Sequence, residues 1–266
     1  MFGYNHENPF AFDINTIPAV FGSPSEDAVS KRYEAIPTAK IVDLMGDLGW
    51  KPVAGNQIKP RRKSLSNPNT VKHAVVFQQY EAKENENGVT GQIVLVNSHD
   101  SLSSYRLHYG LYRFVCANGL MVGDEFAQAK IRHMGKDAVF ANIEEATRNF
   151  VCHSEEVNSR IDDWRHIHLT YGAQIAFAKE AAALRFGEAK AGWFKPQDFL
   201  AARNSEDSQS ESLWNTYNKV QENLVKGGIS GRSPKRRVSI RGLNGLGSIE
   251  FNQNLWNLAE TYANAA

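Results

Sequence analysis

Three features that often reveal a protein's class are missing from this sequence. It has only two cysteines, Cys116 and Cys152, too few for a disulfide framework. We expect both thiols to be reduced and buried, because free cysteine is among the most buried residue types. No stretch approaches the roughly 18 apolar residues of a membrane span, and residues 1–8 show no basic segment followed by an apolar run. The sequence therefore predicts a cytoplasmic protein without a signal peptide.

The chain also lacks an excess of charge of either sign. It carries 30 Lys and Arg against 29 Asp and Glu, a formal net charge of +1. A stoichiometric DNA-binding protein of this size is usually basic. Any contact with nucleic acid must therefore come from local clustering of cations. The remaining composition, 42% hydrophobic in 266 residues, is that of an ordinary globular protein with a sizeable core.

The first third of the chain changes character several times. Residues 1–36 are rich in Asn, Pro, Gly and Ser and predict an irregular N-terminal arm. The arm holds a few apolar anchors, namely Phe10, Phe12, Val20 and Phe21. Residues 37–49 predict a helix that ends at Gly49, and the basic segment 50–70 predicts a loop.

Alternation of polar and apolar residues then indicates a β-meander. We expect strands at residues 73–82, 89–97, 104–108, 112–117 and 125–133. Turns are expected at Gly110, at Asn118-Gly119 and at Gly123-Asp124, and Asn-Gly is the strongest tight-turn signal of the three.

Near residue 138 the hydrophobic period changes to three or four residues. Ile143, Phe150, Ile161 and Trp164 lie on one such stripe, which predicts a long amphipathic helix. Shorter helices are expected at residues 196–203, 211–226 and 249–262. The sequence thus predicts an α+β fold, in which an antiparallel β-meander is followed by a long helix packed on one face. We divide the chain into an arm, an α+β core domain and a C-terminal helical region with a basic Gly-rich loop, at residues 1–36, 37–190 and 191–266.

Two segments concentrate positive charge without any acid. One contains Arg61, Arg62 and Lys63, and the other runs from Lys226 to Arg241. Lys and Arg neutralise phosphates, and glycine amides can form an anion nest. The alternative is a solvated charge run, with Gly227 as a helix C-cap. From these segments we predict that the nucleic-acid-binding residues are Arg61, Arg62, Lys63, Lys226, Arg232, Lys235, Arg236 and Arg237.

Cationic and aromatic residues also alternate along residues 105–113. Rings can stack on bases while cations meet phosphates. Tyr105, Arg106, Tyr109 and Arg113 are therefore further candidates for nucleic-acid contact. We expect at least one tyrosine of this segment to present a stacking surface.

A metal or catalytic site is the weaker interpretation of the histidines. His99 and Asp100 are adjacent, with His108 and Asp124 further along, but no ligand spacing links them. We assign no catalytic residue, no metal and no cofactor. A metal-dependent nuclease using His99, Asp100 and Asp124 is kept as an alternative.

Two segments carry a family resemblance. They are residues 97–124 and the block Leu213–Gly228, which reads Leu-Trp-Asn-Thr-Tyr-Asn-Lys-Val-Gln-Glu-Asn-Leu-Val-Lys-Gly-Gly. The chain resembles the domain-of-unknown-function 932 family of phage, prophage and plasmid proteins, and most closely an enterobacterial prophage subgroup. The resemblance covers nearly the whole chain and implies no catalytic residue. It implies an accessory protein of a mobile element, encoded near DNA-maintenance functions in a bacterial host cell.

We therefore expect a non-enzymatic DNA-binding protein of a phage or prophage, which favours single strands and assists annealing or recombination. Few phosphate contacts per chain favour a homo-oligomer. The N-terminal arm either exchanges between subunits or folds its aromatic residues back on its own subunit. Phage or host recombination or defence proteins are further candidate partners. The main alternative is an anti-defence protein that blocks a host nucleic-acid-handling complex.

The triple variant Arg61→Ala/Arg62→Ala/Lys63→Ala tests the first basic segment. Losing three phosphate contacts should weaken DNA binding equally at all sequences and flatten its salt dependence by about one unit of slope per contact. Titrations at several salt concentrations measure both quantities. Unchanged affinity and slope would mark the segment as a solvated charge run.

Overall fold

The fold is built around one antiparallel sheet, as the sequence predicted. The computed structural model describes residues 8–23, 36–59, 67–80, 88–99, 104–113, 118–123, 127–132, 135–243 and 245–266. Among these, the sheet order is β1-β2-β3-β4-β5, and β6 also pairs with β4. The strands are β1 (Trp50–Gln57), β2 (His73–Gln79), β3 (Val89–Asn97), β4 (Tyr105–Arg113), β5 (Asn118–Met121) and β6 (Gln128–Ile131).

The register of the sheet sorts its side chains onto two faces. Phe77, Ile93 and Tyr109 are cross-strand neighbours on one face, and Val76, Val94 and His108 on the other. The first face carries the main hydrophobic cluster and the second a smaller one that contains Val53, Val76, Val94 and Val96. Both faces are therefore buried.

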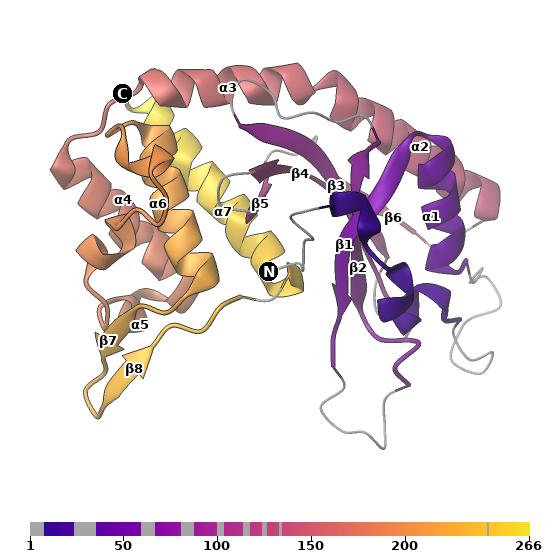
Figure 1. Cartoon of the computed structure of the whole chain (residues 1–266), viewed down its shortest axis with the longest axis horizontal. Coiled ribbons are helices and arrows are strands. Elements are labelled where there is room, and N and C mark those ends of the chain that lie inside the picture. Colours follow the sequence, from indigo (N-terminus) through magenta and orange to yellow (C-terminus); the bar gives the residue numbers. More distant parts are fainter. Residues whose placement is uncertain are drawn as a thin grey trace.

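Helices cover each of these faces (Figure 1). On the first face lie α1 (Thr38–Asp47) and α2 (Lys136–Cys152), and the ring of Phe150 in α2 packs 5.8 Å from that of Tyr109. On the second lies α7 (Gly245–Asn264), whose Ile249 joins the smaller cluster. The sequence predicted the helix on the first face and a closing helix, but not that the closing helix would cover the second face.

The predicted long helix is interrupted twice. After α2, His153 separates it from α3 (Ser154–His166), and residues 167–170 separate α3 from α4 (Tyr171–Phe186). At the second break the amide of Leu213 donates to the carbonyl of Ile167, and Thr170 caps α4. The remaining helices are α5 (Glu188–Ala191), α6 (Leu213–Lys226) and the 3₁₀ turns at Pro9–Ala11, Ile14–Thr16, Pro18–Phe21, Pro196–Leu200 and Glu206–Ser208.

Three local predictions within the sheet were wrong. Residues 50–57 form β1 and not a loop, and Asn118-Gly119 lies within β5. The segment 105–113 is one strand that passes through Gly110, which was expected to be a turn. A Cβ at Gly110 would lie 2.5 Å from the carbonyl oxygen of Leu120, so glycine is needed there for close strand approach.

The described part of the N-terminal arm folds back on its own chain. Ile17, Ala19 and Val20 are buried, and Phe10 packs 5.4 Å from the ring of Tyr80. The carbonyl of Ala19 lies 3.0 Å from Nε2 of His99. Of the predicted aromatic anchors only Phe21 is largely exposed, at 52%. Through these contacts the described part of the arm buries its apolar residues against its own chain.

Two smaller expectations concern cysteine and membranes. Cys152 is exposed at the end of α2, which corrects the expectation that it is buried, while Cys116 lies outside the described residues. None of the helices in the described ranges is long and apolar enough to cross a membrane.

An aromatic cluster joins the helices of the C-terminal half. The ring of Trp164 in α3 lies 6.3 Å from Trp214 and 5.5 Å from Tyr217, both in α6, and 4.5 Å from Trp256 in α7. All four rings are almost fully buried. Trp164 is therefore the common contact of three helices.

The variant Trp164→Ala should lower the free energy of unfolding by about 3–5 kcal/mol, because it leaves a large cavity at this contact. Urea denaturation measures the change. Tyr171→Ala, which removes an exposed ring, serves as the control and should change stability by less than about 0.5 kcal/mol. A loss below about 1 kcal/mol at Trp164 would contradict its central role.

Candidate nucleic-acid interface

The tyrosines of β4 lie inside the protein. Tyr105 is 0% exposed and Tyr109 2%, and the Tyr105 hydroxyl donates to the carbonyl oxygen of Ile36 at 2.5 Å. Burial raises the pKa of Tyr109. A ring covered by its own protein has no face left for a base. The predicted stacking surface is therefore not found at these residues, and we exclude them from the candidate interface.

Arg113 is also used internally. Its side chain is 4% exposed, and its guanidinium lies 2.9 Å and 3.0 Å from the two carboxylate oxygens of Asp207. It also pairs with Glu206 at 3.4 Å. This buried pair connects β4 to the segment before α6. Phosphate contact would require breaking the pair, which typically costs several kcal/mol.

Arg106 also belongs to β4, but it lies on the opposite face of the sheet from Arg113 and is exposed. Its cross-strand neighbour on β6 is Lys130, so two like charges lie side by side on the sheet. No ion pair of Arg106 occurs among the described residues. Arg106 stays a candidate, but it belongs to β4, and Figure 1 shows that strand apart from β7 and β8 of the second basic segment.

The second basic segment forms a small β-hairpin, which we call the basic hairpin, residues 227–241. It consists of β7 (Ser230–Arg232) and β8 (Arg237–Ser239). Gly227 ends α6 at a φ of 74°, and its amide donates to the carbonyl of Asn223. The amide of Gly228 donates to the carbonyl of Ile240 at 2.8 Å. These two amides are engaged within the protein, so an anion nest at Gly227-Gly228 is wrong and the C-cap alternative holds for Gly227.

The turn of the basic hairpin is fixed by Ser233. Its hydroxyl accepts a hydrogen bond from the amide of Arg236 at 3.1 Å and donates to the carbonyl of the same residue at 2.9 Å. The turn holds Lys235 and Arg236 exposed at the tip. The cations are thus presented on an ordered structure, which lowers the entropy lost on binding.

Arg232 and Arg237 lie directly opposite each other across the hairpin. Both are exposed, and neither forms an ion pair within the part of the chain that the structure describes. Like charges in this position destabilise a hairpin, so an anion bound between them would relieve the repulsion. Lys226 is different, because it pairs with the buried Glu222 one turn earlier in α6.

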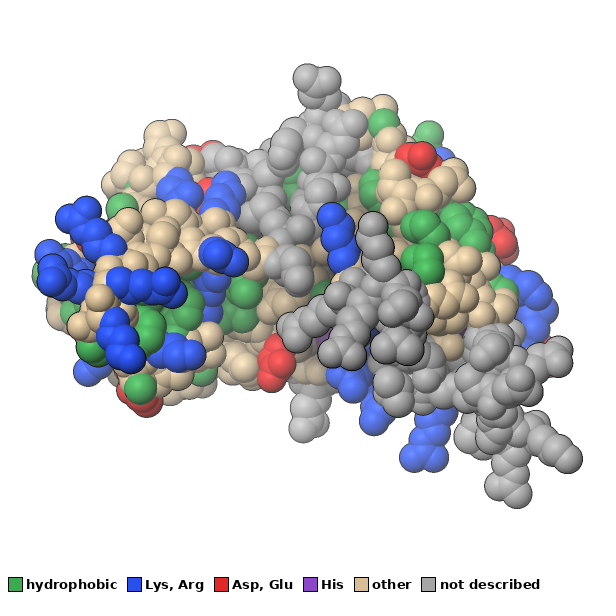
Figure 2. Space-filling view, turned by 90° about the horizontal axis from the view of Figure 1, so that it is seen from below, with side chains coloured by type: hydrophobic (Ala, Val, Ile, Leu, Met, Phe, Trp, Pro, Cys, Tyr) green, Lys and Arg blue, Asp and Glu red, His purple; other side chains and the backbone are tan. Residues whose placement is uncertain are grey.

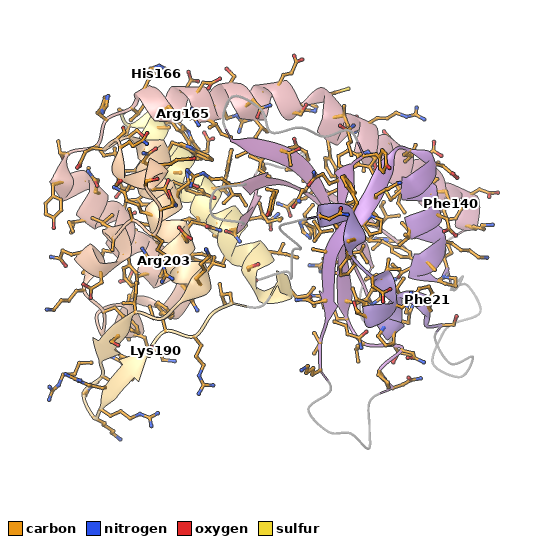
Figure 3. All side chains as sticks on the ribbon, in the orientation of Figure 1. Phe21, Phe140, Arg165, His166, Lys190 and Arg203 are labelled. Atoms are coloured by element: carbon orange, nitrogen blue, oxygen red, sulfur yellow. The ribbon has the colours of Figure 1, made fainter. Side chains whose placement is uncertain are left out.

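Two further cations lie next to the hairpin. The amide of Arg232 donates to the carbonyl of Trp193 at 2.8 Å, which places the end of α5 beside β7. Lys190 and Lys195 flank this contact and are exposed. Figure 2 shows Lys and Arg gathered at this end of the molecule, and Figure 3 shows Lys190 beside the hairpin. The sequence did not reveal these two lysines, because they lie far from the basic run and near Glu188 and Asp198.

The other predicted residues do not extend this cluster. Arg61, Arg62 and Lys63 lie outside the described residues, as do Asp100 and Asp124. His99 is buried against His73, with ring centres 5.3 Å apart. No group of three or more metal-ligating side chains occurs in the described ranges. Two of the three residues of the nuclease alternative, Asp100 and Asp124, thus lie outside these ranges.

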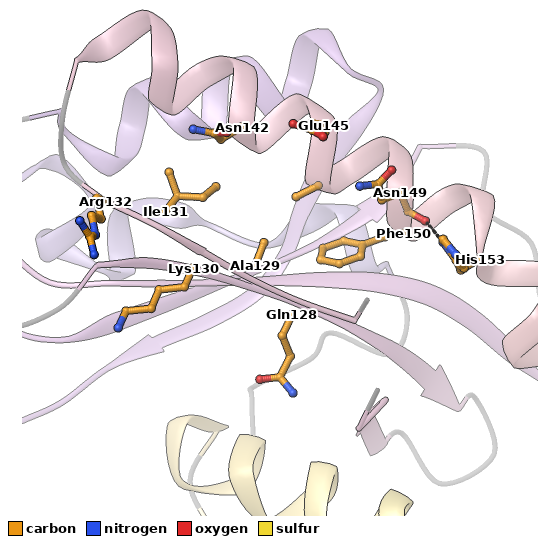
Figure 4. A pocket seen from close by; sticks show the side chains of 11 residues that line it. Gln128, Ala129, Lys130, Ile131, Arg132, Asn142, Glu145, Asn149, Phe150 and His153 are labelled. Atoms are coloured by element: carbon orange, nitrogen blue, oxygen red, sulfur yellow. Dashed lines mark hydrogen bonds between the residues drawn. The ribbon is translucent and has the colours of Figure 1, made fainter. Parts of the chain in front are cut away.

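A separate pocket of about 650 Å³ lies between β6 and α2 (Figure 4). It is lined by Lys130 of β6, by Arg132 just after that strand and by Glu145 of α2. Nδ1 of His153 donates to the carbonyl of Asn149 at 2.8 Å. The pocket shares no residue with the basic hairpin, and its charges are mixed.

The fold and the hairpin define an α+β protein that carries a localised cationic surface. The sequence profile described as "Domain of unknown function (DUF932)" matches residues 27–246, so the chain belongs to this family. The chain is 34% identical to UPF0380 protein YfjQ of Escherichia coli (strain K12), over 93% of this chain and 89% of the relative. It is also 34% identical to UPF0380 protein YafZ of the same strain, over 93% and 88%. No solved structure matches the chain significantly.

A buried histidine on the sheet makes stability depend on pH. Burial, with the nearby Arg106 and Lys72, lowers the pKa of His108 from 6.5 to about 4. The amide Nε2 of Gln253 in α7 lies 3.1 Å from Nδ1 of His108. Because that NH₂ group only donates, Nδ1 carries no proton in the folded state.

We expect stability to fall as the pH drops from about 6.5 to about 4, because the unfolded chain binds a proton at His108 that the folded chain excludes. The variant His108→Gln should flatten the slope of unfolding free energy against pH in this window. Urea denaturation at closely spaced pH values measures it. His73, whose pKa is also lowered to about 4, remains in the variant and keeps part of the slope. An unchanged slope would show that His108 titrates normally.

Proposed function

We propose that this protein is a DNA-binding accessory protein that holds phosphates with the basic hairpin. The observation that carries the proposal is the exposed set Arg232, Lys235, Arg236 and Arg237, which has no acidic partner in the described structure. Each such cation releases counterions when it neutralises a phosphate. The near-zero net charge does not oppose this, because the cations act at short range and the Debye length is only about 8 Å at physiological salt.

The geometry fits the annealing or recombination role expected from the sequence. Side-chain contacts to phosphates fix the backbone of a strand and leave the edges of its bases free. Free base edges are what a strand needs to pair with a complementary one. We therefore propose that the protein assists annealing or recombination of DNA in a bacterial cell.

One hairpin offers few contacts, and binding through so few phosphates is weak at physiological salt. We propose that the protein acts as a homo-oligomer, in which repeated hairpins bind one strand with higher avidity. The described arm already packs on its own subunit through Ala19 and Phe10, so exchange of this segment is not part of the proposal.

The double variant Arg232→Ala/Arg237→Ala tests the proposal. It should weaken binding to a labelled oligonucleotide and reduce the slope of log affinity against log salt by about 0.7 per contact for a single strand. Replacing both opposed arginines also removes their mutual repulsion, so stability should not fall. Fluorescence anisotropy between 50 and 200 mM salt, together with thermal unfolding, measures both effects.

The matched control is Arg148→Ala/Lys179→Ala, which removes the same charge from exposed positions on α2 and α4. It should keep the wild-type salt slope. Equal losses in the two double variants would mean that total charge, not the hairpin, governs binding. Wild-type protein that binds no oligonucleotide at low salt would overturn the proposed function altogether.

A further inference from the structure

We propose that the basic hairpin and Trp193 form a site for single-stranded nucleic acid, in which Trp193 stacks on one unpaired base. The inference rests on the proposed function and adds its strand preference. Cations alone hold phosphates of any nucleic acid. A stacking ring beside them selects a strand whose bases are free.

Trp193 differs from the other tryptophans in its exposure. Trp50, Trp164, Trp214 and Trp256 are exposed by 3%, 1%, 1% and 0%. Trp193 packs against the main core cluster and yet is partly exposed to solvent. Partial exposure leaves part of a large aromatic surface in contact with solvent, where a ligand can cover it.

The ring of Trp193 has no internal aromatic or cationic partner in the described structure. Its neighbour Phe194 by contrast contacts Phe186 at 5.2 Å and Phe199 at 6.3 Å. Trp193 takes part in no such ring pair, and no cation of the described ranges lies over its ring. The solvent-exposed part of the indole is therefore available to a ligand.

Backbone contacts fix Trp193 next to the hairpin cations. Its carbonyl accepts the hydrogen bond from the amide of Arg232 at 2.8 Å, and its amide donates to the carbonyl of Lys190 at 3.1 Å. A Cβ at Gly231 would lie 2.4 Å from the carbonyl oxygen of Trp193 and 2.4 Å from Cδ1 of Phe194. Glycine at position 231 thus lets β7 lie directly against residues 193–194.

The resulting surface combines apolar and cationic parts. Figure 2 shows apolar atoms lying between the Lys and Arg side chains at this end of the molecule. The partly buried apolar residues here are Trp193 and, within the basic hairpin, Ile229 and Val238. This is the arrangement that single strands favour, with bases on aromatic surface and phosphates on flanking cations. In duplex DNA the base faces are already stacked, so the ring gains nothing from it.

Three labelled probes separate the contributions: an oligothymidylate of about 20 nucleotides, a hairpin duplex of equal charge, and an abasic oligonucleotide of equal length. Trp193→Ala should weaken oligothymidylate binding at least about fivefold, since stacking is worth about one factor of ten per base. It should leave duplex and abasic binding unchanged. Trp193→Phe should retain most of the affinity. Tyr171→Ala, an exposed ring at the far end of α4, is the control and should bind all three probes like wild type.

Tryptophan fluorescence gives a second measurement that needs no truncation. Because the other four tryptophans are buried, quenching by oligothymidylate and protection from acrylamide should report mainly on Trp193 and be lost in Trp193→Phe. Wild-type affinity for oligothymidylate in Trp193→Ala, with binding lost in Arg232→Ala/Arg237→Ala, would overturn the stacking proposal and leave phosphate binding intact. Absence of binding by wild type to every probe would overturn both.

Discussion

The burial of α6 on nearly all its sides is the constraint on which the rest of the structure depends. A helix surrounded by protein normally carries apolar residues all round, but α6 carries Asn218, Gln221, Glu222 and Asn223 in buried positions. Buried polar groups need partners. The side-chain amide of Asn223 donates to the carbonyls of Phe199 and Ala201. The side-chain amide of Gln221 donates to Oδ1 of Asn252. These bonds fix the segments around the helix in one arrangement.

The same helix positions the basic hairpin. Its last residues lead into Gly227, and the amide of Leu243 donates back to the carbonyl of Val225 at 2.9 Å, so both ends of the hairpin leave from the end of α6. Arg203 adds a bond from Nε to Oδ1 of Asn223 at 2.7 Å. The hairpin is therefore an extension of a buried element, and the block Leu213–Gly228 anchors both of its ends.

Local sequence patterns predicted most helices and strands. Which candidate residues are exposed depends on contacts between residues far apart in the sequence, which no local pattern predicts. The strand at residues 89–97 and the α+β order follow directly from hydrophobic spacing, and the cationic run of the hairpin is visible in the sequence. The pairing of Arg113 with Asp207 joins residues 94 positions apart, and no local pattern signals it. The tyrosines of β4 alternate like an exposed strand, but helices cover both sheet faces. The proposed role of Trp193 rests on its position beside the hairpin, which one backbone bond to Arg232 reveals and no local sequence pattern signals.

The position of α6 in the chain also determines when the protein can become native during synthesis. Its partners lie on both sides of it, at Phe199 and Ala201 before it and at Asn252 and Trp256 after it. Until α7 has left the ribosome, one side of α6 and the second face of the sheet lack the contacts that α7 provides. Synthesis of α7 therefore completes both halves of the molecule, and the nascent chain exposes an aromatic, aggregation-prone surface until then.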